Sequence, residues 1–191
     1  LVADCVAAMR ATVRVPVTVK CRIGVDDQDE ESALDCFIEK VSATGCSTFV
    51  VHARKAWLQG LSPKENREIP PLRYDLVHRL KTSRPALRIV INGGLSSLEA
   101  CLVQSRLVDG VMLGRAAYHD PYLLHRLDRA LFEPQRELLP RVALLQSLRP
   151  YVESQLAHGV ALKHLTRHVL GLFAGQPGGR IFRQILSEQA S

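Results

Sequence analysis

Short apolar runs rich in β-branched residues alternate with helix-periodic stretches over the first 120 residues, and this alternation most constrains the fold. The pattern predicts strands over 15–22, 48–53, 88–92 and 110–114, and helices over 32–43, 74–81 and 97–104. Such alternation indicates a parallel sheet with crossover helices, an α/β fold. Val2, Val6, Met9 and Val13 recur at helical spacing, which predicts one more helix before the first strand.

Four strands are half of the eight that close a (β/α)8 TIM barrel. Two interpretations follow: the C-terminal half of such a barrel, or a small open α/β sheet complete in itself. The opening helix favours the half barrel, because its apolar face needs a strand before it. Leu1 is not a Met, and we therefore expect the chain to be a fragment of a longer protein.

After residue 120 the pattern becomes entirely helical. One apolar stripe extends from Leu138 to Leu156, with Pro150 expected to kink or split it. A second stripe covers 162–172, and a glycine-rich segment at 175–179 separates it from a last helix that begins near Arg180. The predicted domains are a partial barrel at 1–120 and a helical bundle at 121–191.

Charge and cysteine usage exclude several classes of protein. The net charge is +6, and residues 121–191 contribute +4 of it, from 9 Lys and Arg against 5 Asp and Glu. This excess indicates an anionic partner for the C-terminal part. Five cysteines without a C-x-x-C pair argue against a disulfide framework or a zinc site, and favour a reducing cytoplasm. No apolar run is long enough to span a membrane.

Two strand endings carry the strongest functional signal. Asn92-Gly93-Gly94 and Gly114-Arg115 each follow an apolar run, about one βα unit apart. Consecutive strands that end in bare backbone amides are typical of the phosphate grip formed by the last two βα loops of a barrel. Arg115 would add a fork of donors. A phosphate-bearing cofactor is the leading expectation.

The same strand-end rule selects Lys20, Arg22, His52 and Arg54. Lys20 shares a strand face with Arg22, and we predict that this face lines the barrel interior, where an ammonium group neutralises an anionic cofactor or substrate. A lysine paired with a structural carboxylate is the less favoured alternative. For His52, a ligand contact and a structural role remain equally open.

The loop over 54–71 is long and dense in charge and proline, which marks it as functional or disordered; its apolar residues argue against disorder. Lys64 and Arg67 could reach the phosphates of a large substrate, or form only a solvated charged face. His164 and His168 stand four apart, but no third ligand follows them, so we expect no metal.

Several motifs together resemble the tRNA-dihydrouridine synthases of subfamily A. The resemblance covers nearly the whole chain, and its most specific part is the loop that begins at His52. The motifs are Val17-Thr-Val-Lys-Cys-Arg-Ile-Gly24, His52-Ala-Arg-Lys-Ala-Trp57, Gly60-Leu-Ser-Pro-Lys-Glu-Asn-Arg-Glu-Ile-Pro-Pro71, Ile91-Asn-Gly-Gly94, Gly114-Arg115, Arg167-His168, Gly171-Leu-Phe173 and Gly175-Gln-Pro-Gly178.

The resemblance implies an FMN enzyme that uses NADPH to reduce uridine to 5,6-dihydrouridine in the tRNA D-loop, at position 20/20a. A soluble cytoplasmic monomer is expected, with no metal. The residues that correspond to FMN contacts are Lys20, His52, Asn92, Gly93, Gly94, Gly114 and Arg115. Those that correspond to tRNA contacts are Lys64, Arg67, Arg180 and Arg183. At 100° per residue, the two arginines of the last helix lie opposite its apolar arc.

The family's proton donor is a Cys on a loop in the first half of the barrel, and its motif is absent from this sequence. Neither Cys5 nor Cys21 stands in that motif. We therefore expect the 191-residue chain by itself to be inactive and to bind FMN weakly. Two alternatives remain: another flavin barrel that acts on pyrimidines, which leaves the basic helical tail unexplained, and a non-catalytic RNA-binding remnant.

Overall fold

The computed structural model describes residues 1–189. It divides into two compact units, the first formed by 1–95 and 100–112 and the second by 96–99 and the residues from 113 onward. The predicted boundary at residue 120 stays a prediction, because compactness does not show which part folds independently.

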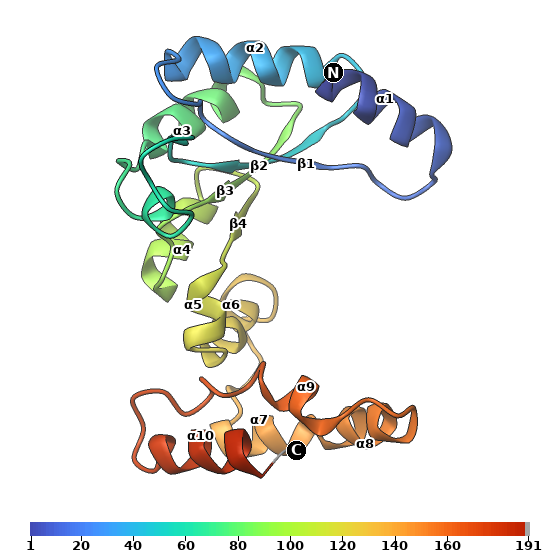
Figure 1. Ribbon diagram of the computed structural model, residues 1–191, viewed down its shortest axis with the longest axis vertical. Helices are drawn as coiled ribbons and strands as arrows, with labels where there is room; N and C mark the ends of the chain where they lie inside the picture. The colour runs from blue at the N-terminus through green and yellow to red at the C-terminus, as the bar shows by residue number, and fades with distance from the viewer. Residues whose placement is uncertain (190–191) are drawn as a thin grey trace. The chain divides into compact units, whose positions relative to one another are not determined.

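The first unit is built on a four-stranded parallel sheet in the order β1-β2-β3-β4, which confirms the α/β fold (Figure 1). The strands are β1 (Val19–Arg22), β2 (Thr48–His52), β3 (Arg88–Asn92) and β4 (Gly110–Met112). Sequential strands are neighbours, as crossover connections require. The first strand was predicted to begin at residue 15 but begins at Val19, and exposed Val15 and Pro16 precede it. Pro16 cannot donate to a ladder.

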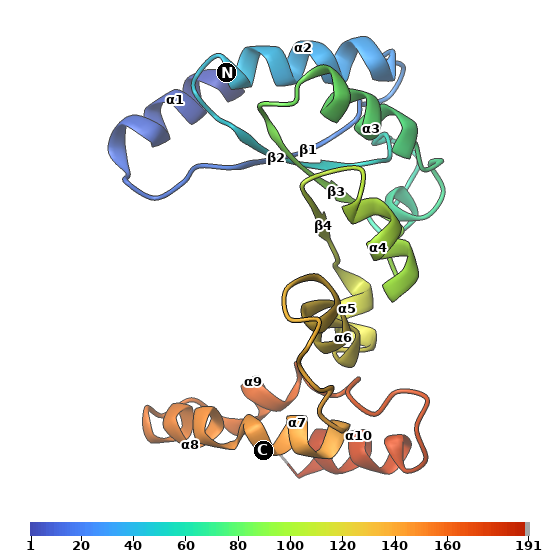
Figure 2. The same ribbon diagram turned by 180° about the vertical axis from the view of Figure 1, so that it is seen from behind.

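Side chains alternate along the strands and give the sheet two different faces. One face carries Phe49, Val51, Ile89 and Ile91, all fully buried. Helices α2 (Glu30–Ser42), α3 (Tyr74–Ser83) and α4 (Leu98–Ser105) follow successive strands, and Figures 1 and 2 show α2 and α3 on the same side of the sheet. Their buried residues, Leu34, Ile38, Val41, Leu76, Val77, Leu80 and Cys101, complete the core of this unit.

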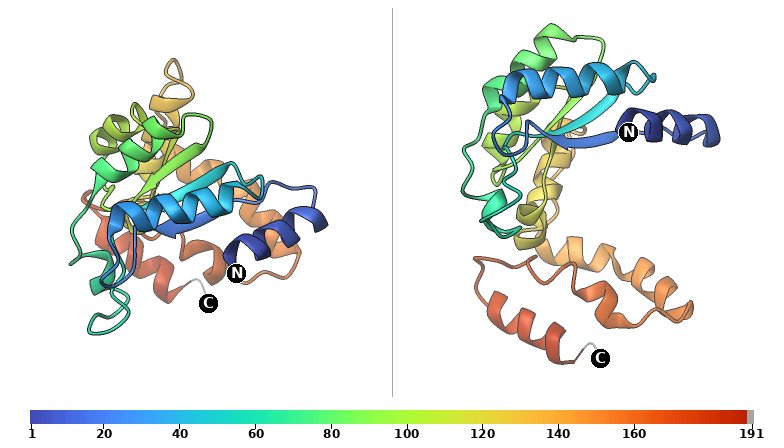
Figure 3. Two further views of the ribbon diagram at one scale, coloured as in Figure 1. Left: turned by 90° about the horizontal axis from the view of Figure 1, so that it is seen from above. Right: turned by 45° about the horizontal axis from the view of Figure 1, so that its top comes forward.

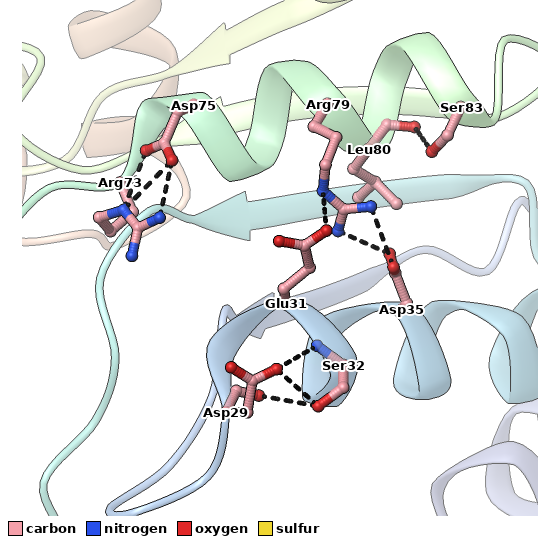
Figure 4. A network of polar contacts seen from close by, with 9 residues as sticks. All are labelled: Asp29, Glu31, Ser32, Asp35, Arg73, Asp75, Arg79, Leu80 and Ser83. Carbon is pink, nitrogen blue, oxygen red and sulfur yellow. Dashed lines mark hydrogen bonds and ion pairs between the residues drawn. The ribbon is translucent and has the colours of Figure 1, made fainter.

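Charged side chains join α2 to α3 (Figure 4). Arg79 on α3 donates through both terminal nitrogens to Asp35 on α2, at 3.0 Å each, and its Nε lies 3.2 Å from Glu31. Asp29 caps α2 by accepting the Ser32 amide at 2.9 Å. The fork geometry of Arg79 fixes the two helices in register on the sheet.

The predicted opening helix is present as α1 (Val2–Thr12), although only Val6 of its apolar positions is buried. Arg10 Nε donates to the Thr44 carbonyl at 3.2 Å, just after the end of α2. Figure 3 shows α1 beside that end of α2. Val2, Met9 and Val13 are exposed, so the apolar face predicted for this helix is only partly covered within the first unit.

The described part of the second unit contains helices and no strands. Pro150 lies at the start of a new helix, and the predicted split of the first apolar stripe is thereby confirmed. The second stripe was predicted to be helical to residue 172, but its helix ends at Thr166 and turns follow. The helices are α5 (Arg115–His119), α6 (Tyr122–Leu131), α7 (Arg141–Ser147), α8 (Arg149–Ala157), α9 (Leu162–Thr166) and α10 (Gly179–Glu188).

Leu123, Leu127 and Leu172 form the buried core of the second unit. Arg141 lies over the Tyr122 ring at 4.2 Å and donates to Asp120 and to the Leu172 carbonyl, which holds the turns after α9 in place. Within residues 1–189, the helices are all too short or too polar to traverse a lipid bilayer.

Candidate functional site

The second face of the sheet carries the polar residues selected from the sequence. Lys20 pairs in register with Val50, and Arg22 pairs with His52, which in turn pairs with Asn92. Residues that pair directly in a parallel sheet point to the same face. The structure therefore places Lys20, Arg22, His52 and Asn92 on one face, at the carboxyl ends of three neighbouring strands.

His52 is the electrostatic centre of this face. It is 7% exposed, and burial lowers its pKa, as do the positive charges of Arg22, Lys20, Arg54 and Arg67, to about 4. The imidazole is thus neutral at physiological pH, and the surrounding field is positive. Such a field favours an anionic ligand.

The two cations of β1 share this environment. Burial lowers the pKa of the Lys20 ammonium, and the neighbouring Arg22 charge lowers it further, although Lys20 as a residue is exposed. Burial also lowers the pKa of Arg22, as do Arg67 and Arg54. Because like charges disfavour each other, an anion bound here would relieve repulsion among them.

The Asn92-Gly93-Gly94 turn is locked by its neighbours. Asn92 Nδ2 donates to the Met112 carbonyl at 2.7 Å, and the Tyr74 hydroxyl donates to the Gly93 carbonyl at 2.6 Å. Gly93 has φ +108°, and a Cβ there would stand 2.5 Å from His52 Cδ2. Only glycine lets the chain pass this close to the imidazole. Tyr74 was not singled out from the sequence, because nothing in a helix-initiating tyrosine marks that contact.

The long loop after β2 makes hydrogen bonds with β1 and with the residues that follow β1. Arg22 donates from Nη1 to the carbonyls of Lys55 and Asn66, at 2.8 and 2.9 Å. Ala56 pairs with Val25 in an isolated parallel bridge. A short 3₁₀ helix, η1 (Glu65–Arg67), interrupts the loop. The sequence left two alternatives for this loop, functional or disordered. These contacts argue against disorder.

Lys64 precedes η1, Arg67 is its last residue, and both are exposed. Arg67 is near enough to Arg22 and His52 to lower the pKa of both. The loop thus extends the positive field from the sheet to the surface of the first unit.

Gly114 and Arg115 lie in the second unit, where they begin α5. The fourth strand was predicted to reach Gly114 but ends at Met112. A Cβ added to Gly114 would meet no atom within 4 Å. That this residue pair grips the same phosphate as Asn92 to Gly94 stays a prediction.

Arg180 and Arg183 are exposed on α10. The Phe182 ring packs against the Phe173 ring at a tilt of 56°, with centroids 4.7 Å apart, which anchors one side of the helix. His168 is bound through Nδ1 to the Tyr118 hydroxyl at 2.8 Å and lies beyond the end of α9, so it does not share a helix face with His164. Among residues 1–189, no three His, Cys, Asp or Glu side chains gather as metal ligands would.

Comparison with known proteins identifies the family. The model of the dihydrouridine synthase (Dus) family matches residues 1–191. This chain belongs to the dihydrouridine synthase family. The tRNA-dihydrouridine(20/20a) synthase of Xanthomonas campestris pv. campestris is 62% identical over 191 residues, which are 100% of this chain and 56% of that protein.

Two further relatives have the same name. That of Xylella fastidiosa (strain 9a5c) is 61% identical over 98% of this chain and 55% of its own length. That of Salmonella typhimurium is 53% identical over 100% of this chain and 58% of its own length. The chain thus spans a little over half the length of these curated relatives.

Proposed function

We propose that this chain is the FMN-binding and tRNA-binding part of an enzyme that reduces uridine to 5,6-dihydrouridine in the D-loop of tRNA, at position 20/20a, with NADPH as reductant. Family membership and the names of the relatives support the reaction. The observation that carries the cofactor assignment is the positively charged sheet face around His52. In this proposal the four strands are half of a (β/α)8 barrel, and the helical residues form a separate tRNA-binding domain.

The residues of the charged face fit a flavin mononucleotide. A phosphate and a ring system that becomes negative on reduction both match a field made by Lys20, Arg22 and their neighbours. A Cβ at Gly93 would clash with His52, and a Cβ at Gly94 would clash with Leu72, so only glycines fit at this strand end. When bound, FMN supplies the hydride that uridine accepts.

Each residue then has a defined part. The Lys20 ammonium would stabilise negative charge at the pyrimidine end of the flavin. His52, neutral at physiological pH, would offer the ring one hydrogen-bonding nitrogen without adding a charge. Asn92 is held by the Met112 carbonyl; Gly114 and Arg115 would contact the phosphate.

The reduction also needs a proton donor for the uracil ring. Neither the family resemblance nor the position of Cys5 or Cys21 in the structure supports one of these cysteines as that donor. Burial raises the pKa of the Cys21 thiol to about 12, an effect that the Lys20 charge only partly offsets, so Cys21 is a weak acid. Cys5 is exposed on α1. We infer that the donor lies outside these 191 residues, and that the chain alone does not reduce uridine.

We infer that Lys64 and Arg67 contact tRNA phosphates beside the flavin. We infer further that Arg180 and Arg183, on the helical unit, orient the tRNA. Their exposure leaves all four available to a polyanion. Binding should therefore weaken steeply with salt. A cytoplasmic monomer remains our expectation.

The test uses the protein expressed with any coding sequence that precedes Leu1. Purified protein should contain FMN, oxidise NADPH and form dihydrouridine in unmodified tRNA. Lys20→Ala should abolish the reaction, while Lys40→Ala, which changes an exposed lysine on α2, should leave it intact. Reduction of free pyrimidines without tRNA, or tRNA binding by a protein that takes up no flavin, would contradict the proposal.

A further inference from the structure

Trp57 is the only tryptophan in the chain, and it lies at the surface of the loop after β2. It is 39% exposed, so part of the residue is accessible to a ligand in solution. Its position next to the charged sheet face raises the question of what its ring contacts.

The backbone of Trp57 is held rigidly by one side chain. Asn66 Oδ1 accepts the Trp57 amide at 2.7 Å, and Asn66 Nδ2 donates to the Trp57 carbonyl at 2.7 Å. The carboxamide therefore pairs with Trp57 as a neighbouring strand would. Asn66 itself is held by Arg22, which donates to its carbonyl at 2.9 Å.

The residues on both sides of Trp57 are fixed as well. Ala56 donates to the Gly24 carbonyl at 3.0 Å, and Leu58 donates to Asp26 Oδ1 at 2.8 Å. Asp26 makes this contact with φ +48°, a left-handed conformation that is uncommon outside glycine. Strained backbone that is held by several contacts is frequent at ligand-binding sites.

One cation contacts the ring, and two more stand on the same loop. The Lys55 ammonium lies over it, 5.7 Å from the centroid, and is itself held 3.9 Å from Glu30. Lys64 and Arg67 stand on the same loop and are exposed. A partly exposed aromatic ring on a loop that also carries exposed cations is an arrangement with which proteins bind unpaired nucleotides, through base stacking on the ring and phosphate contacts with the cations.

We propose that Trp57 is a stacking platform for an unpaired base of the RNA substrate, next to the uridine that enters the site. The base stacks on the ring face away from Lys55. The proposal rests on the proposed function, because it assumes that the loop meets tRNA. It adds a residue that contacts a base to a set of cations that contact phosphates.

Because the chain has one tryptophan, its emission reports on this site directly. Unmodified tRNA titrated into the 191-residue chain should quench the emission and protect it from iodide. Trp57→Ala should weaken tRNA binding by about 5- to 150-fold, the range for loss of one stacked base. Trp57→Phe should restore most of the affinity, and Leu58→Ala, which removes a neighbouring side chain that is 71% exposed, should change nothing.

Salt dependence separates stacking from a structural role. Trp57→Ala should leave the slope of log affinity against log salt unchanged, whereas Arg67→Ala should reduce it by about 1. Unchanged affinity in Trp57→Ala, unquenched emission in saturating tRNA, or a slope altered by Trp57→Ala would each overturn the stacking proposal alone. Absence of any tRNA binding by the unaltered chain would overturn the tRNA assignment together with it.

Discussion

Gly93→Ala tests the close approach between the third strand end and His52. The added Cβ would stand 2.5 Å from His52 Cδ2 and 2.8 Å from Nε2, in a backbone with φ +108°. Two costs therefore add: about 1–2 kcal/mol for an L residue in a left-handed conformation, and about 1–3 kcal/mol for overpacking. We expect a loss of about 3 kcal/mol in the free energy of unfolding of the first unit.

Two other glycines separate these costs. Gly60 has φ +82° with nothing within 4 Å of an added Cβ, so Gly60→Ala carries the backbone cost alone. Gly24, also in the first unit, has no positive φ, and an added Cβ would meet its nearest atom, the Glu30 Cα, at an ordinary contact distance of 3.6 Å, so Gly24→Ala should leave stability almost unchanged. The expected order of stability is Gly24→Ala, then Gly60→Ala, then Gly93→Ala.

The assay is urea unfolding followed by Trp57 emission, which reports on the first unit. With an m-value of about 1.5 kcal/mol/M, a loss of about 3 kcal/mol lowers the midpoint by about 2 M. If Gly93→Ala unfolds at the same midpoint as Gly60→Ala, the contact with His52 does not constrain the chain. The reasoning that places glycine there to admit the imidazole would then be wrong.

Three further predictions concern charge. Because the pKa of His52 falls from 6.5 unfolded to about 4 folded, the unfolded state binds the extra proton. The free energy of unfolding should hold above pH 6.5 and fall by about 3 kcal/mol towards pH 4; urea titrations in which His52→Gln retains that acid-side loss would contradict this. Arg79→Lys should lower the free energy of unfolding by about 0.5–1 kcal/mol, because lysine cannot make the two parallel hydrogen bonds to Asp35. A loss of stability that persists in about 1 M salt would argue against an ion-pair origin. Arg180→Ala with Arg183→Ala should weaken tRNA binding and reduce its salt dependence in filter-binding assays, while the FMN content stays unchanged. Loss of FMN in this double variant would contradict the proposal that these arginines bind tRNA and not the cofactor.

The sequence determined the order of elements and the fold class, because both depend on local periodicity. Short β-branched apolar runs such as Phe49-Val50-Val51 are typical of strands buried on a sheet, and the helical spacing of Leu34 and Ile38 fits one covered face. Strand ends were predicted less well: Val15 and Gly114 have strand-like neighbours but lack a partner to pair with. Pairing is a property of the sheet, and one segment does not encode it alone.

The sequence also selected Lys20, Arg22, His52 and Asn92 one by one, from the rule that strand ends carry function. Only the tertiary structure decided that the register places them in one field, where burial and four cations lower the pKa of His52 to about 4. Tyr74 and Asn66 entered the site for the same reason. Their hydrogen bonds join positions 19 and 9 residues apart, and such contacts form only when the chain has folded.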